Sequence, residues 1–187
     1  MQISEINAEQ MASEARARVA QWHDYVSERL GREPRGFCDV SAFNEAGKPA
    51  VIRVSSVVDE KPFPTMFWLI DADISLKIDR LEAAGWISRL QKLVNESDVI
   101  KGQMRQAHDA HQRLREDFLT EAEVELLNAR GMMSALSERG IGGIQESDRI
   151  RCLHTWYAAH MVDTNCVGVA VDRLMESTEG FEWPLSQ

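Results

Sequence analysis

The chain has 187 residues, 44% of them hydrophobic, and a formal net charge of −9 at pH 7. A chain of this length and apolar content can bury the core of one domain, which excludes an intrinsically disordered protein. The negative charge disfavours nucleic acid as a partner, because a phosphate backbone would repel the chain as a whole.

The N-terminus and the cysteines predict a cytoplasmic protein. Residues 1–31 lack the basic start and apolar run of a signal peptide. No stretch approaches the ~18 to 20 apolar residues of a membrane span, so no contact with a membrane is expected. Cys38, Cys152 and Cys166 are odd in number and far apart, which suits a reducing compartment better than a disulfide framework.

Residues 1–31 predict an N-terminal helix. Apolar residues recur at spacings of four and three from Met11 to Leu30, and Gly31 follows as a stop signal. Because the apolar seam is narrow, the helix is expected on the surface or paired with another helix. It is the predicted contact for a protein partner or for a second copy of the chain, and its deletion is expected to leave a folded domain.

Residues 36–72 predict a β-meander of about three antiparallel strands. The runs FCDVSAF, PAVIRVSSVV and PTMFWLI are rich in β-branched and aromatic residues. The segments NEAGKP and DEKPFP, which separate these runs, contain turn residues.

Residues 73–177 predict a helical layer, and residues 178–187 a tail. Ser97 is a predicted N-cap, Thr120 and Glu123 have the spacing of a capping box, and another helix is expected from about residue 148 to 162. The predicted fold is therefore α+β. It is a single domain in which a small antiparallel sheet packs against a mostly helical C-terminal layer, with an N-terminal helix in addition.

Several segments, in order along the chain, read PFPTMFWLI, RLEAAG, RGIGG, RCLHTWYAAHM and TNCVG. In this combination the chain resembles a bacterial family catalogued as domain of unknown function 501, whose members typically read PFPTLYWLTCP, RLEAAG, KCLHAHYA and NPVG. The resemblance spans roughly residues 36 to 170 and implies no activity, since none is established for the family. Asp71 stands where the family has a cysteine, and Cys166 where it has a proline.

Anion binding at the RGIGG loop is the hypothesis that the sequence motivates best. Glycines directly before a helix allow backbone amides to converge on an oxyanion, and arginine forks match phosphate or carboxylate oxygens. The predicted ligand-binding residues are Arg139, Gly140, Gly142, Gly143, Arg149, Arg151 and His154. The alternative is a tight loop whose glycines only allow unusual backbone angles. A non-enzymatic protein that docks a partner through its helices is the other class of function.

Zinc is the one cofactor that the sequence suggests. Cys38, Cys152 and His154 are zinc-ligand types, and Asp71 could supply an oxygen. On a regular helix residues 152 and 154 lie about 200° apart, so both could face one ion only in a loop or a distorted segment. The topology favours contact of either Cys38 or Asp71, not both, with the start of the helix, and a buried apolar role for Cys152.

Two further groupings contain histidine. Cys152 with His154 or His160 has the residue types of a nucleophile and its base, so enzymatic activity is neither predicted nor excluded. His108 and His111, three residues apart on a polar helix, are interpreted as part of a solvated face.

Overall fold

The computed structural model describes residues 2–184, with side chains from residue 10 onward. The strands are β1 Phe37–Phe43, β2 Pro49–Val54, β3 Val57–Val58, β4 Lys61–Pro62 and β5 Phe67–Leu69. The helices are α1 Gln2–Leu30, α2 Ala72–Ala83, α3 Trp86–Glu96, α4 Asp98–Phe118, α5 Glu121–Ala129, α6 Ser134–Ser137, α7 Leu153–His160 and α8 Cys166–Glu176, with the short 3-10 helix η1 Ile141–Gly143 before α7. The α+β class is confirmed.

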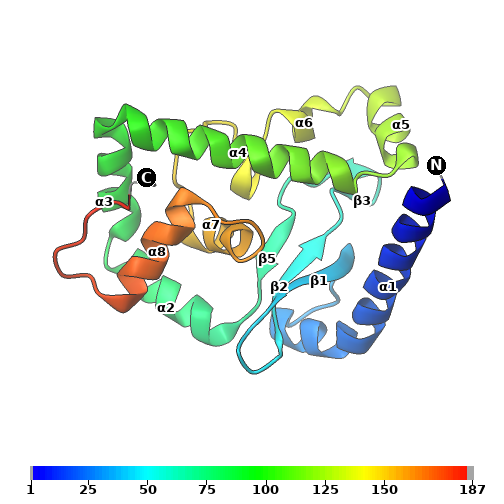
Figure 1. Cartoon of the computed structure of the whole chain (residues 1–187), viewed down its shortest axis with the longest axis horizontal. Coiled ribbons are helices and arrows are strands. Elements are labelled where there is room, and N and C mark those ends of the chain that lie inside the picture. The colour runs from blue at the N-terminus through cyan, green and yellow to red at the C-terminus, as the bar shows by residue number, and fades with distance from the viewer. Residues whose placement is uncertain (1, 185–187) are drawn as a thin grey trace.

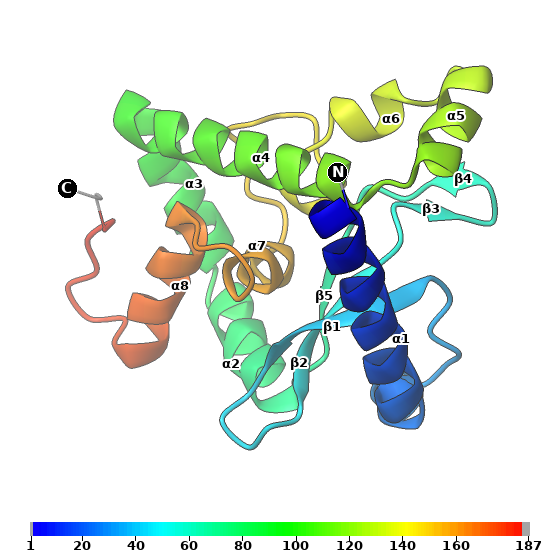
Figure 2. The ribbon, with the colours of Figure 1, turned by 45° about the vertical axis from the view of Figure 1, so that its right-hand side comes forward.

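A three-stranded antiparallel sheet in the order β1-β2-β5 lies between two sets of helices (Figure 1). α1 covers one side, and α7, with α4 and α8 around it, lies on the other (Figure 2). The third predicted run is β5, but the second divides. β2 ends at Val54, and β3 pairs with β4 in a separate small hairpin.

Alternate residues of β2 enter two different cores, because successive side chains of a strand point to opposite faces. Ile52 and Val54 pack with Val26 of α1, whereas Val51 packs with the helical layer. Trp156 of α7 is almost completely buried in that second core, which fixes α7 between the sheet and its neighbours. No helix in the described part of the chain combines the length and apolar character needed to cross a membrane.

Local signals in the sequence set several helix starts. The Ser97 hydroxyl accepts a hydrogen bond from the amide of Ile100 at the start of α4, and Thr120 with Glu123 forms the predicted capping box of α5. These caps satisfy amides that have no partner inside the helix.

Candidate functional site

The helix predicted in the segment RCLHTWYAAHM begins later than the sequence pattern suggests. α7 starts at Leu153, and its N-cap residue Cys152 is extended, with φ −155° and ψ 127°. The prediction of a helix from about residue 148 is therefore wrong, and the 200° separation of residues 152 and 154 does not apply. The Cys152 Sγ lies 3.8 Å from Nδ1 of His154. Cys152 is half-buried and polar in its contacts, so the buried apolar role expected for it is also wrong.

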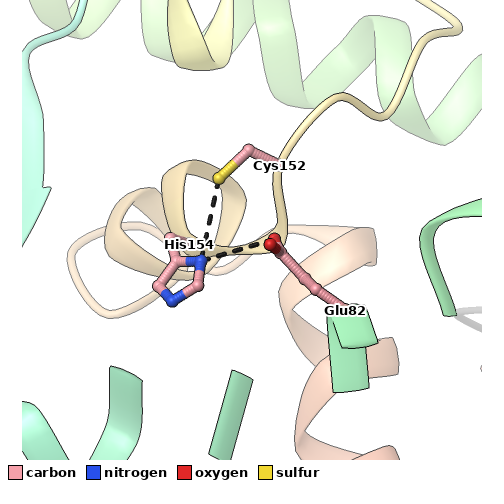
Figure 3. Close-up of side chains that lie close together, drawn as sticks. All are labelled: Glu82, Cys152 and His154. Atoms are coloured by element: carbon pink, nitrogen blue, oxygen red, sulfur yellow. Dashed lines mark hydrogen bonds and ion pairs between the residues drawn. The ribbon is translucent and has the colours of Figure 1, made fainter. Parts of the chain in front are cut away.

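Glu82, near the end of α2, completes this cluster. Its Oε1 lies 3.3 Å from His154 Nδ1 and accepts a hydrogen bond from the amide of Leu153 at 2.6 Å. One ligand atom from each of Glu82, Cys152 and His154 lies within 4.8 Å of the other two. Figure 3 shows the three side chains meeting at the start of α7.

Asp79 lies on the opposite side of the His154 ring. Its Oδ1 is 3.3 Å from His154 Nε2, so both ring nitrogens face a carboxylate. The hydrogen bond and charge of Cys152, together with Glu82, raise the pKa of His154 to about 9, although burial acts in the other direction. In the metal-free protein this imidazole is therefore protonated at neutral pH.

Asp71 and Cys38, the other two proposed zinc ligands, make their hydrogen bonds outside this cluster. Asp71 caps α2 through the amides of Asp73 and Ile74, and it accepts a further bond from the Asn44 side chain. Cys38, on β1, donates to the carbonyl of Arg53. The sequence predicted one of these two residues at the start of α7, but Glu82 lies there instead.

The RGIGG loop uses at least three of its amides inside the protein. Gly140 donates to the Ile144 carbonyl, Ile141 to Nδ1 of His108, and Gly143 to the Gly140 carbonyl. Gly142 and Gly143 have φ values of 70° and 69°, in the left-handed region that glycine adopts without strain. The loop packs on α7, since a Cβ on Gly142 would lie 2.8 Å from the Thr155 hydroxyl.

The predicted arginines differ in their surroundings. Arg139 donates to the carbonyl of Gly143, Arg151 is paired with Glu146, and Arg149 is exposed. Gly142 therefore lies beside α7, the Arg139 side chain donates its hydrogen bond within the loop itself, and His154 belongs to the cluster with Glu82. Anion binding by this set stays a prediction.

The histidine pair on α4 is buried, contrary to the prediction from the sequence. His108 and His111 are both buried, at 4% and 5% exposure, so their assignment to a solvated face is wrong. Nδ1 of His108 accepts a hydrogen bond from the amide of Ile141, and the centroid of its ring lies 4.8 Å from that of Trp156. His108 therefore contacts the RGIGG loop directly, whereas the His111 ring packs against Phe67 of β5.

Sequence reasoning missed Glu82 and Asp79, although a signal for them was present. The segment DRLEAAG has two carboxylates three residues apart, a spacing that places both on one helix face. Ile78 and Leu81 are buried and hold the adjoining face of α2 against the core.

A model of the family described as Protein of unknown function (DUF501) matches residues 40–173. The chain belongs to this family. The matched DUF501 region contains Asp79, Glu82, Cys152 and His154, whereas α1 and Cys38 lie before it. No curated protein and no solved structure matches the chain.

Proposed function

We propose that this protein binds a zinc ion through Glu82, Cys152 and His154. The observation that carries the proposal is the convergence of a thiol, an imidazole and a carboxylate within 4.8 Å at one point. These are the donor types that zinc takes in proteins. A thiolate and a carboxylate repel each other, so their close approach is unfavourable without a cation. Together they would balance the two positive charges of the zinc ion.

The distances support an ion of this size. Bonds of about 2.0 to 2.3 Å in a tetrahedron separate the donor atoms by about 3.3 to 3.6 Å. His154 Nδ1 lies 3.3 Å from Glu82 Oε1 and 3.8 Å from Cys152 Sγ. The third pair, Cys152 Sγ and a Glu82 carboxylate oxygen, lies within 4.8 Å, so side-chain rotations that bring these two atoms closer would complete the coordination.

Three protein donors leave one coordination position for water or another ligand, as in catalytic zinc sites. An oxyanion bound there would lie at the start of α7, against which the RGIGG loop packs through Gly142 and Thr155. The zinc proposal thus gives the predicted anionic ligand a place to bind, with Arg149 and Arg151 in the segment that leads into α7.

Metal analysis of the purified full-length protein tests the proposal. We expect about one zinc ion per chain after dialysis against trace zinc, and loss of that ion in Cys152→Ser, His154→Gln and Glu82→Gln. Cys166→Ser is the matched control, because Cys166 is a half-buried thiol that lies at the start of α8. Equal zinc content in Cys152→Ser and Cys166→Ser would refute the site.

A second candidate function is nucleophilic catalysis by Cys152 in the metal-free protein. It is favoured by the order of the groups, with Cys152 on one ring nitrogen of His154 and Asp79 on the other. Iodoacetamide should then alkylate Cys152 faster than Cys38 when a chelator is present, and His154→Gln should remove the difference. Equal alkylation rates of the two thiols would exclude this activity.

The zinc site suits a reducing compartment such as the bacterial cytoplasm, because Cys152 must remain an unoxidised thiolate to bind the ion. The three free cysteines are consistent with that location. The proposal leaves a separate role for α1, whose first half carries the exposed Met11 and remains the predicted contact for a protein partner or a second copy.

A further inference from the structure

One turn of α2 presents two carboxylates to opposite edges of the same imidazole ring. Glu82 Oε1 lies 3.3 Å from Nδ1 of His154, and Asp79 Oδ1 lies 3.3 Å from Nε2. Only the Glu82 side also contains the Cys152 thiol. A metal ion held by Glu82 and Cys152 would therefore meet Nδ1, and Asp79 would contact the nitrogen that the ion leaves free.

From this geometry we infer that Asp79 is a positioning residue of the zinc site, which holds His154 with Nδ1 directed at the ion. The inference rests on the proposed function. Asp79 does not bind the ion itself, because the imidazole ring separates it from the point where Cys152 and Glu82 meet.

The physical reason lies in the two tautomers of imidazole. Nδ1 can bind a metal only when it carries no proton, so the remaining proton must sit on Nε2. A carboxylate beside Nε2 stabilises that tautomer, fixes the ring orientation and increases the basicity of the coordinating nitrogen. Without Asp79, the tautomer with its proton on Nδ1 would compete with metal binding.

The other two ligands are already held by contacts of their own. Glu82 accepts the 2.6 Å hydrogen bond from the Leu153 amide, and the backbone at Cys152 is tied by the bond from the Thr155 hydroxyl to its carbonyl at 3.1 Å. Asp79 supplies the corresponding contact for His154. All three ligands would then have an outer partner, as is usual in protein metal sites.

Competition with a chromophoric zinc chelator tests the inference on the full-length protein. We expect Asp79→Ala to weaken zinc binding by about 10- to 100-fold, and Asp79→Asn by less, because asparagine keeps an oxygen acceptor but not the charge. Asp73→Asn is the matched control, since Asp73 is an exposed aspartate on the same helix. The Asp79 side chain is 66% exposed, so Asp79→Ala should keep the thermal unfolding midpoint of the control.

A spectroscopic readout separates positioning from a general structural effect. Nitrogen NMR of the zinc-loaded wild type should show Nδ1 of His154 bound to metal and Nε2 protonated. In Asp79→Ala we expect a mixed population that includes coordination through Nε2.

The outcomes distinguish this inference from the zinc proposal. If wild type and Asp73→Asn fail to bind zinc, the proposed function is wrong and the role of Asp79 is refuted with it. If both bind tightly and Asp79→Ala binds within about twofold of them, or keeps pure Nδ1 coordination, only the role of Asp79 is refuted.

Discussion

Arg115 is the residue that connects the RGIGG loop to the rest of the fold. It is 1% exposed, and its guanidinium donates to the backbone carbonyls of Pro64, Leu136, Arg139 and Gly140. Burial lowers its pKa to about 10, so it stays charged at neutral pH. No carboxylate in the described part of the chain lies within ion-pair distance of this group. Several carbonyl dipoles therefore take the place of a counter-ion.

Replacement of Arg115 by methionine should destabilise the protein strongly. Methionine retains most of the side-chain length but removes all four hydrogen bonds, and only the carbonyls of Leu136 and Gly140 keep an amide donor, from Arg139 and Gly143. We therefore expect the free energy of unfolding to fall by about 3 kcal/mol. Urea denaturation measures this change. Arg113→Met is the control, because Arg113 is exposed on the same helix. Similar losses in the two variants would contradict this role for Arg115.

The sequence identified residue types for the site better than their partners. It named Cys152 and His154, since both are uncommon residues with obvious chemistry. It missed Glu82 because the spacing of Asp79 and Glu82 only places them on one helix face, and tertiary contact alone shows that this face meets His154. The burial of Arg115, His108 and His111 was missed for a similar reason, since a polar helix is normally solvated and the loop that covers this one lies beyond residue 138 in the sequence.

At the scale of whole elements, predictions succeeded where the signal was local. The N-cap at Ser97 and the capping box at Thr120 depend on residues three apart, and the structure confirms both. The start of α7 depends on tertiary contact, because the Leu153 amide is capped by Glu82 from another helix. β3 was merged with β2 because VIRVSSVV has no glycine or proline at the break, and β4 lies in the segment DEKPFP, which was predicted to be a turn.

α1 divides into two halves that the apolar seam did not distinguish. Its second half is core, because Val26 is fully buried against Ile52, Val54 and Ile70. In the first half Met11 is 66% exposed. The interpretation of the whole helix as a surface contact is therefore corrected for the second half and stays a prediction for the first.

Two truncations separate these halves. Removal of residues 1–16 keeps the Arg18–Asp39 ion pair and should leave thermal unfolding close to that of the full chain. Removal of residues 1–30 exposes one face of the sheet and should cost at least ~3 kcal/mol, since each large apolar side chain buried contributes about 1.5 to 3 kcal/mol. Circular dichroism melts would show the difference. A cooperative melt at an unchanged midpoint after removal of residues 1–30 would show that α1 is dispensable, as the sequence alone suggested.

At the scale of the whole molecule, the core carries two histidines that resist protonation. Burial lowers the pKa of His108 to about 4 and that of His111 to about 3, and the positive charge of Arg115 acts in the same direction on His111. In the described part of the chain neither Nε2 atom has a hydrogen-bond partner. Both rings are therefore neutral in the folded protein, whereas they take up protons near pH 6.5 once the chain unfolds.

This difference predicts a loss of stability in mild acid. A lowered folded-state pKa means that the stabilisation is present above about pH 6.5 and declines as the pH falls toward about 4. Each histidine contributes a slope of up to about 1.4 kcal/mol per pH unit. His154 and His23 have raised pKa values, so their contributions change mainly above pH 6.5.

Urea denaturation of the metal-free protein between pH 6.5 and 5 measures the slope, above the range in which most carboxyl groups titrate. The slope of His111→Leu should be flatter than that of wild type by about 0.7 kcal/mol per pH unit at pH 6.5 and by about 1.3 near pH 5, whatever its absolute stability, because leucine cannot take up the proton. His23→Gln should keep the wild-type slope, since His23 is on the surface. Equal slopes for His111→Leu and wild type would mean that His111 is protonated in the folded protein, which would require water or a rearranged partner inside the core.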